Sequence, residues 1–401
     1  MQEILYLDTA RLGQISPSAK RALNGALEFN QAFGASAYFD DFLFGGAQAL
    51  SAADEFDGLS SWDGIDRFKA RIKCHLFGSD NGDVVFASRT ASLMSLAAKM
   101  LFSRCRNVLV TDLCWEPYLG VLAGHKPNDA CQITEIKIKD QILNQRATAE
   151  EITDLIAAAY CEHKCDGIFL PAVCNFGVQL PMRKIMKAIA GRAKIRFSVV
   201  DAAQAINHVD IQWARDSVDF TFGSTHKWLR AYEPMAVGYC SRPSSRSFIH
   251  DLVKRELGAD MHADSLLRLT HSNAQQNAET VNLCPLFAAA GALEDAELIG
   301  NHPDVEASRA VACELASKAG WHEIQVDAEF QSNILLLKNR AFQRANTGAL
   351  RRLLFRQGLA VTDYAGGICR LSLTDVISEE QAWRLGVALN NINTDVAPDV
   401  A

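Results

Sequence analysis

The chain has 401 residues and a formal net charge of −7, from 40 Lys and Arg against 47 Asp and Glu. A mildly acidic chain without a basic block is a poor candidate for nucleic-acid binding, because phosphate contacts need clustered Lys and Arg. No apolar run is long enough to cross a bilayer, and the first residues lack the pattern of a signal peptide. We therefore expect a cytoplasmic protein with neither a membrane nor a nucleic acid as its partner.

From about residue 66, helical stretches alternate with short β-branched runs. The predicted strands are 83–87, 107–111, 133–139, 166–172, 196–201, 217–222 and 236–240, and the helices between them include 90–102, 148–162 and 182–190. Strands that alternate with helices of this length form βαβ units. The pattern predicts an α/β fold with a mostly parallel, seven-stranded sheet.

The pattern changes after residue 300. It predicts a helix at 304–320, strands at 323–326 and 333–338, a helix at 345–357, a strand at 368–373 and a last helix at 379–390. This order is typical of a smaller α+β unit.

The eleven cysteines are scattered, and most lie in apolar runs. The cluster with the most metal-like spacing is Cys161-Glu-His163-Lys-Cys165, but no second cluster with ligand spacing accompanies it. A helix end before a strand explains this cluster better than zinc does. We therefore predict free thiols and no metal site.

Polar or aromatic residues follow most of the predicted strands of the large sheet. In chain order, the residues singled out are Thr90, Ala91, Trp115, Asn175, Asp201, Gln204, Ser224, His226 and Lys227. Singly, each has a structural explanation: a threonine or aspartate caps a helix, and a tryptophan fills a core. Because ligands of an open parallel sheet bind beyond the carboxyl ends of its strands, the recurrence at successive ends predicts a binding site.

The chemistry that suits these residues is that of pyridoxal phosphate. Lys227 would hold the cofactor as a Schiff base, and Asp201 would pair with its pyridine nitrogen and keep it protonated, so that the ring acts as an electron sink. Ser224 and His226 would hold the phosphate together with the helix that opens at Thr90.

Three further residues complete the predicted cofactor site. Trp115 would stack on the ring face, and Asn175 and Gln204 would hydrogen-bond the ring hydroxyl oxygen or the substrate.

Two segments carry a resemblance to a known family. Val200-Asp201-Ala-Ala-Gln204 is followed by Ser224-Thr-His226-Lys227, and Lys227 comes 26 positions after Asp201. This pair resembles the fold-type I pyridoxal phosphate enzymes of aminotransferase class V, a group that includes cysteine desulfurases, isopenicillin N epimerase-like proteins and kynureninases.

The resemblance implies an organisation as well as a cofactor. It implies a large cofactor-binding domain at residues 26–285, a small α+β domain from 1–25 and 286–401, and a homodimer with shared active sites. Thr280 stands in a segment that resembles the one reaching the partner subunit's cofactor phosphate. At Ala91 the family has a hydroxyl, so here the backbone amide alone would bind phosphate.

Two arginines are candidates for substrate binding. Arg370 stands in a strand that resembles the one whose arginine binds the substrate carboxylate, a role that suits a guanidinium because it donates two parallel hydrogen bonds. Arg11 lies in the opening turn, where the family has small residues. It would bind a second acidic group of the substrate or be simply exposed.

The resemblance implies an enzyme that acts at the Cα of an amino acid, with Lys227 as proton carrier. Transamination comes first among the reactions, and a lyase, cyclase or epimerase acting on a specialised amino acid is the rival. A persulfide-forming cysteine desulfurase is disfavoured, because residues 360–368 contain no cysteine and Cys369 lies within a strand.

Three alternatives from other classes were weighed. Ser224-Thr-His-Lys227 also spells the Ser-x-x-Lys pattern of serine acyl-enzyme hydrolases, but no Lys-Thr-Gly accompanies it. A nicotinamide dehydrogenase is disfavoured because no Gly-x-Gly occurs. A non-catalytic binding protein with this fold is also disfavoured, because it would not need Lys227, Asp201 and Arg370 together.

Overall fold

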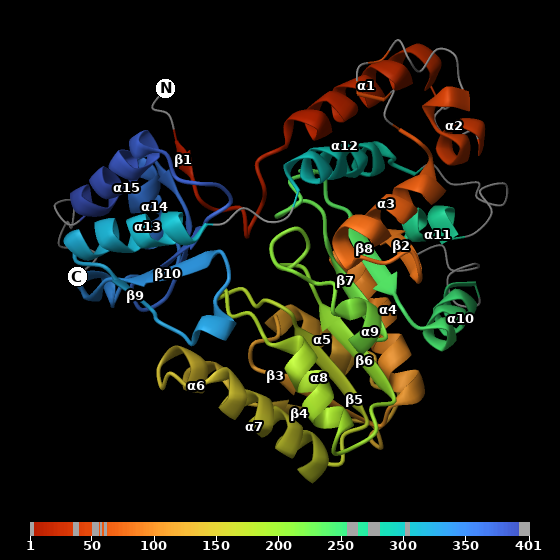
Figure 1. The fold of residues 1–401 in the computed structure, drawn as a ribbon, viewed down its shortest axis with the longest axis horizontal. Helices are drawn as coiled ribbons and strands as arrows, with labels where there is room; N and C mark the ends of the chain where they lie inside the picture. The colour runs from red at the N-terminus through yellow and green to blue at the C-terminus, as the bar shows by residue number, and fades with distance from the viewer. Residues whose placement is uncertain are drawn as a thin grey trace.

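The computed structural model describes residues 4–34, 40–49, 56, 58–59, 62–254, 264–271, 281–300 and 305–392. Figure 1 shows a large sheet wrapped by helices beside a smaller unit that contains the N-terminal strand and the last helices.

The large sheet has seven strands. In spatial order they are β2 (Asp83–Ala87), β8 (Ala236–Cys240), β7 (Phe220–Ser224), β6 (Phe197–Asp201), β5 (Gly167–Pro171), β3 (Asn107–Thr111) and β4 (Gln132–Ile136). All neighbours are parallel except at β8, which is antiparallel to both β2 and β7. This confirms the predicted α/β class and the mostly parallel, seven-stranded sheet.

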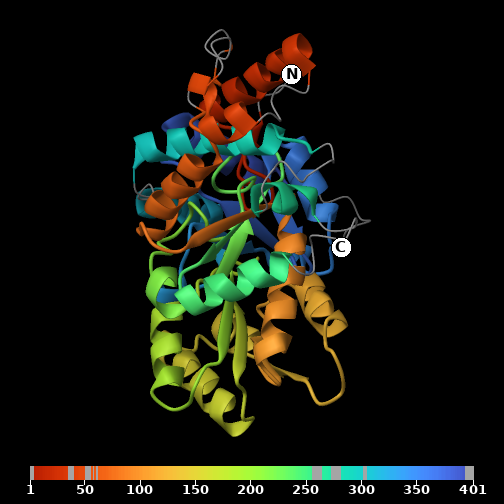
Figure 2. The same cartoon turned by 90° about the vertical axis from the view of Figure 1, so that its right-hand side faces the viewer.

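The inner strands β5, β6, β7 and β8 are fully buried and mainly apolar because both faces of the sheet are covered, whereas the edge strand β4 is partly exposed. Leu109 and Ile168 contribute to the core on one face, whereas Val108 and Phe169 contribute to the core on the other. The helices α7 (Ala149–Glu162) and α8 (Met182–Ala190) pack on the first face, and α4 (Thr90–Arg104), α5 (Glu116–Gly124) and α10 (Pro243–Leu252) on the second. Figure 2 shows the sheet between these layers.

Two strands of the large sheet differ from their predicted ranges by more than one residue at an end. Strand β4 ends at Ile136 rather than at 139, because Asp112 accepts the N–H groups of Ile138 and Lys139 and turns the chain into α6 (Lys139–Leu143). The region from 217 to 219 is not strand: α9 (Ala214–Ser217) ends there, and β7 starts only at Phe220. The carboxyl end of β7 is therefore Ser224.

The smaller unit has a four-stranded antiparallel sheet. Its order is β12 (Thr362–Tyr364), β13 (Ile368–Ser372), β10 (Ile334–Lys338) and β9 (His322–Glu323), with α13 (Glu306–Lys318), α14 (Ala349–Arg356) and α15 (Glu379–Asn391) around it. Strand β1 (Leu5–Tyr6) pairs in parallel with β11 (Leu359–Ala360). One core contains Leu5 and Leu7 together with residues after 305. The exact domain boundaries stay a prediction.

The remaining helices pack on one another and beside strand β2 at the edge of the large sheet. They are α1 (Pro17–Phe33), α2 (Asp40–Gly45), α3 (Ile65–Phe77), α11 (Ser265–His271) and α12 (Cys284–Ile299), with short 3-10 turns at Ala47–Ala49, Ala328–Phe330 and Arg340–Phe342. Asp295 of α12 accepts hydrogen bonds from the backbone N–H and the hydroxyl of Ser18, at 2.8 and 2.6 Å. This contact fixes the start of α1 on α12, and the two helices run side by side in Figure 1.

Within the described residues, no helix combines the length and the apolar surface needed to cross a bilayer. The same residues contain no group of three or more His, Cys, Asp or Glu side chains arranged to hold a metal ion. All eleven cysteines are free thiols, and seven of them are buried.

Candidate active site

A cavity of about 640 Å³ lies at the carboxyl ends of β5 and β6, and residues of both the large sheet and the smaller unit line it. Of the residues predicted from the sequence, Arg11, Thr90, Trp115, Asn175, Asp201, Gln204, His226, Lys227 and Arg370 line this cavity. Ala91 and Ser224 do not line it, and Thr280 lies outside the described residues. The predicted residues therefore converge from elements far apart in the sequence.

Lys227 lies three residues beyond the end of β7, in a loop that the N-terminal segment holds in place. The backbone N–H of Gly13 donates to the His226 carbonyl at 2.8 Å, and that of Ser16 donates to the Arg230 carbonyl at 3.0 Å. Burial lowers the pKa of Lys227 to about 8, against the opposing effect of Asp201. A neutral amine, the form that acts as a nucleophile or a base, is therefore accessible near neutral pH.

Asp201 is the last residue of β6 and is buried at the floor of the cavity. One carboxylate oxygen accepts the backbone N–H of Ala203 at 2.8 Å. Burial raises the pKa of Asp201 to about 6, although this hydrogen bond and the Lys227 charge act in the opposite direction. A cationic partner stabilises the ionised form of a buried carboxylate, and a protonated pyridine nitrogen is such a partner.

His226 and Thr90 line the same cavity as Lys227. Thr90 is the first residue of α4, where backbone N–H groups lack partners within the helix and favour an anion. The Nδ1 atom of His226 is buried and has no hydrogen-bond partner among the described residues. Burial, together with the Lys227 charge, lowers the pKa of His226 to about 4, so its ring is neutral and one nitrogen can donate. These groups fit a phosphate.

Ser224 and Ser92 are committed elsewhere. The Ser224 hydroxyl is buried and donates to the Ala203 carbonyl at 3.3 Å, and the Ser92 hydroxyl donates to Asp264 at 2.7 Å. The role predicted for Ser224 in holding the phosphate therefore needs a rotation of its side chain and stays a prediction.

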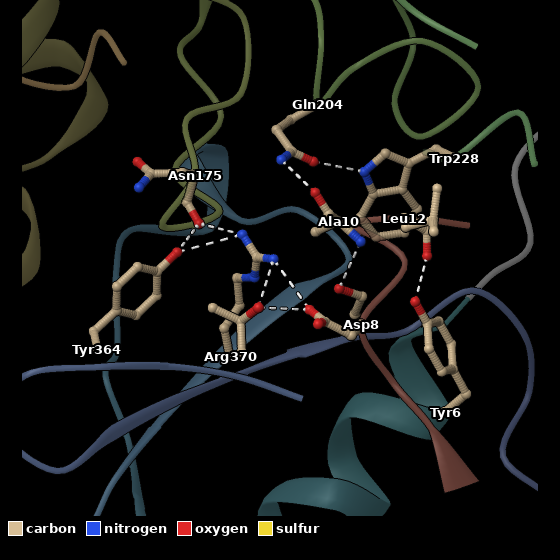
Figure 3. A network of polar contacts seen from close by, with 11 residues as sticks. Tyr6, Asp8, Ala10, Leu12, Asn175, Gln204, Trp228, Tyr364 and Arg370 are labelled. Atoms are coloured by element: carbon tan, nitrogen blue, oxygen red, sulfur yellow. Dashed lines mark hydrogen bonds and ion pairs between the residues drawn. The ribbon is translucent and has the colours of Figure 1, made fainter. Parts of the chain in front are cut away.

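The Gln204 amide is fixed on both sides. It donates to the Ala10 carbonyl at 2.7 Å and accepts the indole N–H of Trp228 at 2.9 Å (Figure 3). The Trp228 ring in turn stacks on His208 with a centroid separation of 3.6 Å. The second amide N–H of Gln204 is left for a ligand in the cavity.

Trp115 presents its indole to the cavity and is 50% exposed, which is unusual for a tryptophan that serves only the core. It precedes α5 and meets Tyr118 edge to face, with ring centroids 4.8 Å apart. The buried Tyr118 limits the positions open to the indole, so a planar ligand would find an oriented ring face.

Arg370 of β13 is buried in a network of neutral and acidic groups (Figure 3). One terminal nitrogen donates to the Asn175 carbonyl at 3.1 Å and to the Tyr364 hydroxyl at 3.3 Å. The other contacts Asp8 at 3.2 Å and the Thr362 hydroxyl at 3.3 Å. Its Nε is buried with no partner among the described residues. The guanidinium is thus oriented but retains donor capacity for a carboxylate.

The sequence did not predict several polar or aromatic lining residues, among them Tyr118, Thr347, Arg351, Arg352, Thr362, Asp363 and Tyr364. The sequence does contain a pattern from which the position of the β12 residues could have been predicted. The Gly366-Gly367 pair marks a hairpin, and such a hairpin places Thr362 opposite Arg370. No comparable local signal placed α14 at the cavity.

The fold and this site together define a class of protein. A lysine and an aspartate at the carboxyl edge of a mostly parallel sheet, beside an antiparallel unit that supplies an arginine, match fold type I of the pyridoxal phosphate enzymes. The family model for aminotransferase class-V matches residues 60–398, and the chain belongs to this family. The match confirms the family predicted from the sequence, and with it pyridoxal phosphate as the cofactor of that family.

Solved structures share the fold over nearly the whole chain. The alanine–glyoxylate aminotransferase from Nostoc sp. has a TM-score of 0.69 at 15% identity and covers 98% of this chain and 96% of its own. The ureidoglycine–glyoxylate aminotransferase from Bacillus subtilis has a TM-score of 0.68 at 14% identity, covering 100% and 96%. A C-DES variant, described with glycine covalently linked to its PLP cofactor, has a TM-score of 0.64 at 14% identity, covering 97% and 96%. No curated protein sequence matches the chain.

The contact between the N-terminal segment and the lysine loop gives a first prediction. Gly13 is buried, and an added Cβ would overlap the Lys227 carbonyl oxygen. We expect Gly13→Ala to destabilise the protein by about 1–3 kcal/mol, as overpacking does, and to weaken retention of the cofactor because the lysine loop must move. Thermal unfolding and the fraction of cofactor retained after dialysis measure the two effects.

Gly120→Ala is the matched control, because an added Cβ there meets nothing within 4 Å. It lies inside α5, where alanine is the better helix former, so the control should be neutral or slightly stabilising. Equal behaviour of the two variants would contradict the proposed support of Lys227 by the N-terminal segment.

Proposed function

We propose that the protein is a pyridoxal phosphate-dependent aminotransferase that acts at the Cα of an amino acid. The observation that carries the proposal is the placement of Lys227, Asp201 and Arg370 around one cavity. Membership of the aminotransferase class-V family and the likeness to two solved aminotransferases support it.

The bound cofactor supplies an electron sink that stabilises negative charge at the substrate Cα. Asp201 would accept a hydrogen bond from the protonated ring nitrogen, and this cation would lower the pKa of Asp201 that burial raises. The phosphate would be held by the start of α4 at Thr90 and by His226, and Trp115 would cover the ring. Asn175 and Gln204 would hydrogen-bond the ring hydroxyl oxygen.

Lys227 would carry out the proton transfer. Its Nζ would take the proton from the substrate Cα, and the carbon to which that proton is returned would decide between transamination and epimerisation. The lowered pKa of about 8 suits this task, because a base works best when its pKa is near the working pH.

Arg370 would orient the substrate by binding its carboxylate. The guanidinium N–H groups available for this are the unpartnered Nε–H and those of the terminal nitrogens that have only long contacts. Fixing one end of the substrate decides which Cα bond lies perpendicular to the cofactor ring. The surrounding hydrogen bonds from Arg370 to Asn175 and Tyr364 keep the guanidinium in position before the substrate arrives.

The burial and the raised thiol pKa values of Cys174 and Cys369 argue against persulfide chemistry. Cys174 lines the cavity, but burial raises the pKa of its thiol to about 11. Cys369 is buried in β13, and burial raises its pKa further. A protonated thiol is a poor nucleophile, so neither cysteine suits the role of a desulfurase nucleophile.

The hydrolase alternative has little support in the geometry. A Ser-x-x-Lys acyl-enzyme needs the Ser224 hydroxyl to face the substrate, whereas that hydroxyl is buried and bonded to the Ala203 carbonyl. Lyase, cyclase and epimerase reactions use the same residues as transamination, so they are separated by the products. The homodimer with shared active sites and the cytoplasmic location remain predictions.

The test is a half-reaction with the purified protein loaded with pyridoxal phosphate. We expect an amino donor to convert the cofactor to its stable pyridoxamine form with release of a keto acid, and a second keto acid to restore the original absorbance. Ammonia released together with the keto product would replace the aminotransferase assignment with a lyase. A protein that stays colourless after the cofactor is added would contradict the whole proposal.

A further inference from the structure

The cavity holds more positive charge than the proposed chemistry uses. Arg11, Arg351 and Arg352 line it in addition to Lys227 and Arg370. Arg11 follows β1 in the opening turn, whereas Arg351 and Arg352 lie on α14 of the smaller unit, so a single wall of the cavity combines two distant segments.

These three arginines have no ion-pair or side-chain hydrogen-bond partner among the described residues. The carboxylates nearby are already committed. Asp363 accepts the backbone N–H groups of Gly348 and Arg351, at 2.7 and 3.2 Å, and so holds the first turn of α14. Asp8 pairs with Arg370 at 3.2 Å. The arginines are therefore available to a ligand.

The charge that remains after the proposed roles are assigned points to a second anion. Asp201 and Lys227 serve the cofactor, and Arg370 serves the carboxylate at the substrate Cα. Three guanidinium groups that face one cavity repel one another, and an anion placed between them relieves this repulsion while accepting bidentate hydrogen bonds. A neutral side chain would leave that wall without a ligand.

We infer that the substrate is an amino acid with an acidic side chain, whose anionic group is bound by Arg11, Arg351 and Arg352 at the part of the cavity wall that these three arginines form. This inference rests on the proposed function and adds the substrate class. The chemistry that the arginines recognise is a carboxylate or a phosphate, and the experiment below distinguishes the two.

The neighbouring surface supplies an internal control. Arg11, Arg351 and Arg352 also border a second cavity of about 390 Å³, which Arg356 lines as well. Arg356 is exposed on the same helix, but it does not line the cavity that contains Lys227. Its replacement therefore removes an equal charge from α14 without touching the proposed side-chain site.

The experiment is a binding titration on the cofactor-loaded protein, with probes that lack an amino group and so need no turnover. The probes are glutarate, its monoamide glutaramate, in which a neutral amide replaces one of the two carboxylates, and 4-phosphonobutyrate, and their binding is measured by calorimetry. We expect glutarate or the phosphonate to bind roughly 10- to 100-fold more tightly than glutaramate, the difference expected for hydrogen bonds to a charged group. The tighter of the two identifies the anion.

The variants decide whether the arginines cause this preference. The double variant Arg351→Gln, Arg352→Gln should reduce the preference for the anionic probe to within about threefold, and Arg11→Gln should reduce it in part, since each removes charge-assisted hydrogen bonds. Arg356→Gln should leave it unchanged. An equal loss in Arg356→Gln would show general electrostatic attraction and would overturn the inference.

The failure of this inference is distinct from the failure of the proposed function. If the loaded protein transaminates neutral amino acids as well as glutamate and aspartate, and glutaramate binds as tightly as glutarate, the substrate class is wrong while the aminotransferase stands. If the protein takes up no pyridoxal phosphate, both are wrong.

Discussion

Replacing Lys227 with alanine is expected to abolish turnover and the absorbance band of the lysine-bound cofactor. The side chain would provide both the covalent attachment and the base for the Cα proton, and a positioned base alone is worth about 10²- to 10⁴-fold in rate. We therefore expect kcat to fall by roughly 10⁴-fold or more. The measurements are the visible spectrum after loading with pyridoxal phosphate and the rate of the half-reaction.

A matched control is Lys137→Ala. This lysine is on the same chain but exposed, with a 69% exposed side chain that forms only a surface ion pair with Glu135. It should retain both the absorbance band and the rate. Because the alanine at 227 removes an amine that burial destabilises, the fold should persist, and circular dichroism checks this. A Lys227→Ala protein that keeps its coloured band would show that another residue holds the cofactor.

The second large effect is expected at Asp201. Asparagine has the size of aspartate but no negative charge, so the ring nitrogen would lose the group that keeps it protonated. We expect Asp201→Asn to lower kcat by roughly 10²- to 10³-fold, the usual cost of removing one preorganised electrostatic group. The cofactor should still attach, because Lys227 is intact. Single-turnover absorbance measurements separate attachment from the later proton transfer.

Two observations separate an electrostatic role of Asp201 from a merely structural one. A cofactor analogue with a methylated, permanently positive ring nitrogen should restore part of the rate in Asp201→Asn. Asp112→Asn, at the exit of strand β3 and two strands away from β6, should have little effect, because Asp112 lies outside the cavity and its acceptor role in turning the chain is kept by the amide oxygen. No rescue by the charged analogue would argue against the assignment.

Much of the large sheet could be predicted from local patterns, since runs such as Val84-Val85-Phe86 are apolar on both faces and strands of a covered parallel sheet need this. One error arose where a side chain from a distant segment intervened. Asp112 ends β4 early by binding two backbone N–H groups from another segment, and a contact over 26 residues leaves no trace in local periodicity.

Some residues of the candidate site could also be predicted from local sequence, whereas others could not. Asp201 and Lys227 were predictable because one ends a strand and the other lies three residues beyond a strand, and the carboxyl ends of parallel strands meet at one edge. Arg351 and Arg352 were not, because their position depends on how the smaller unit lies against the large sheet. Ser224 was predicted to face the phosphate, but its hydroxyl is bonded to the Ala203 carbonyl, a contact that depends on the pairing of β6 with β7.

By itself, the sequence determined the α/β class and the family, and it predicted the pair Asp201 and Lys227, because strand burial and strand ends are local properties of the chain. Only the tertiary structure decided what surrounds them. It joins Arg11 from the first turn to Arg351 and Arg352 of α14 at one cavity wall, although some 340 positions separate them. The −7 charge of the whole chain gives no hint of this wall, because net charge is a sum and the fold decides where the cations gather.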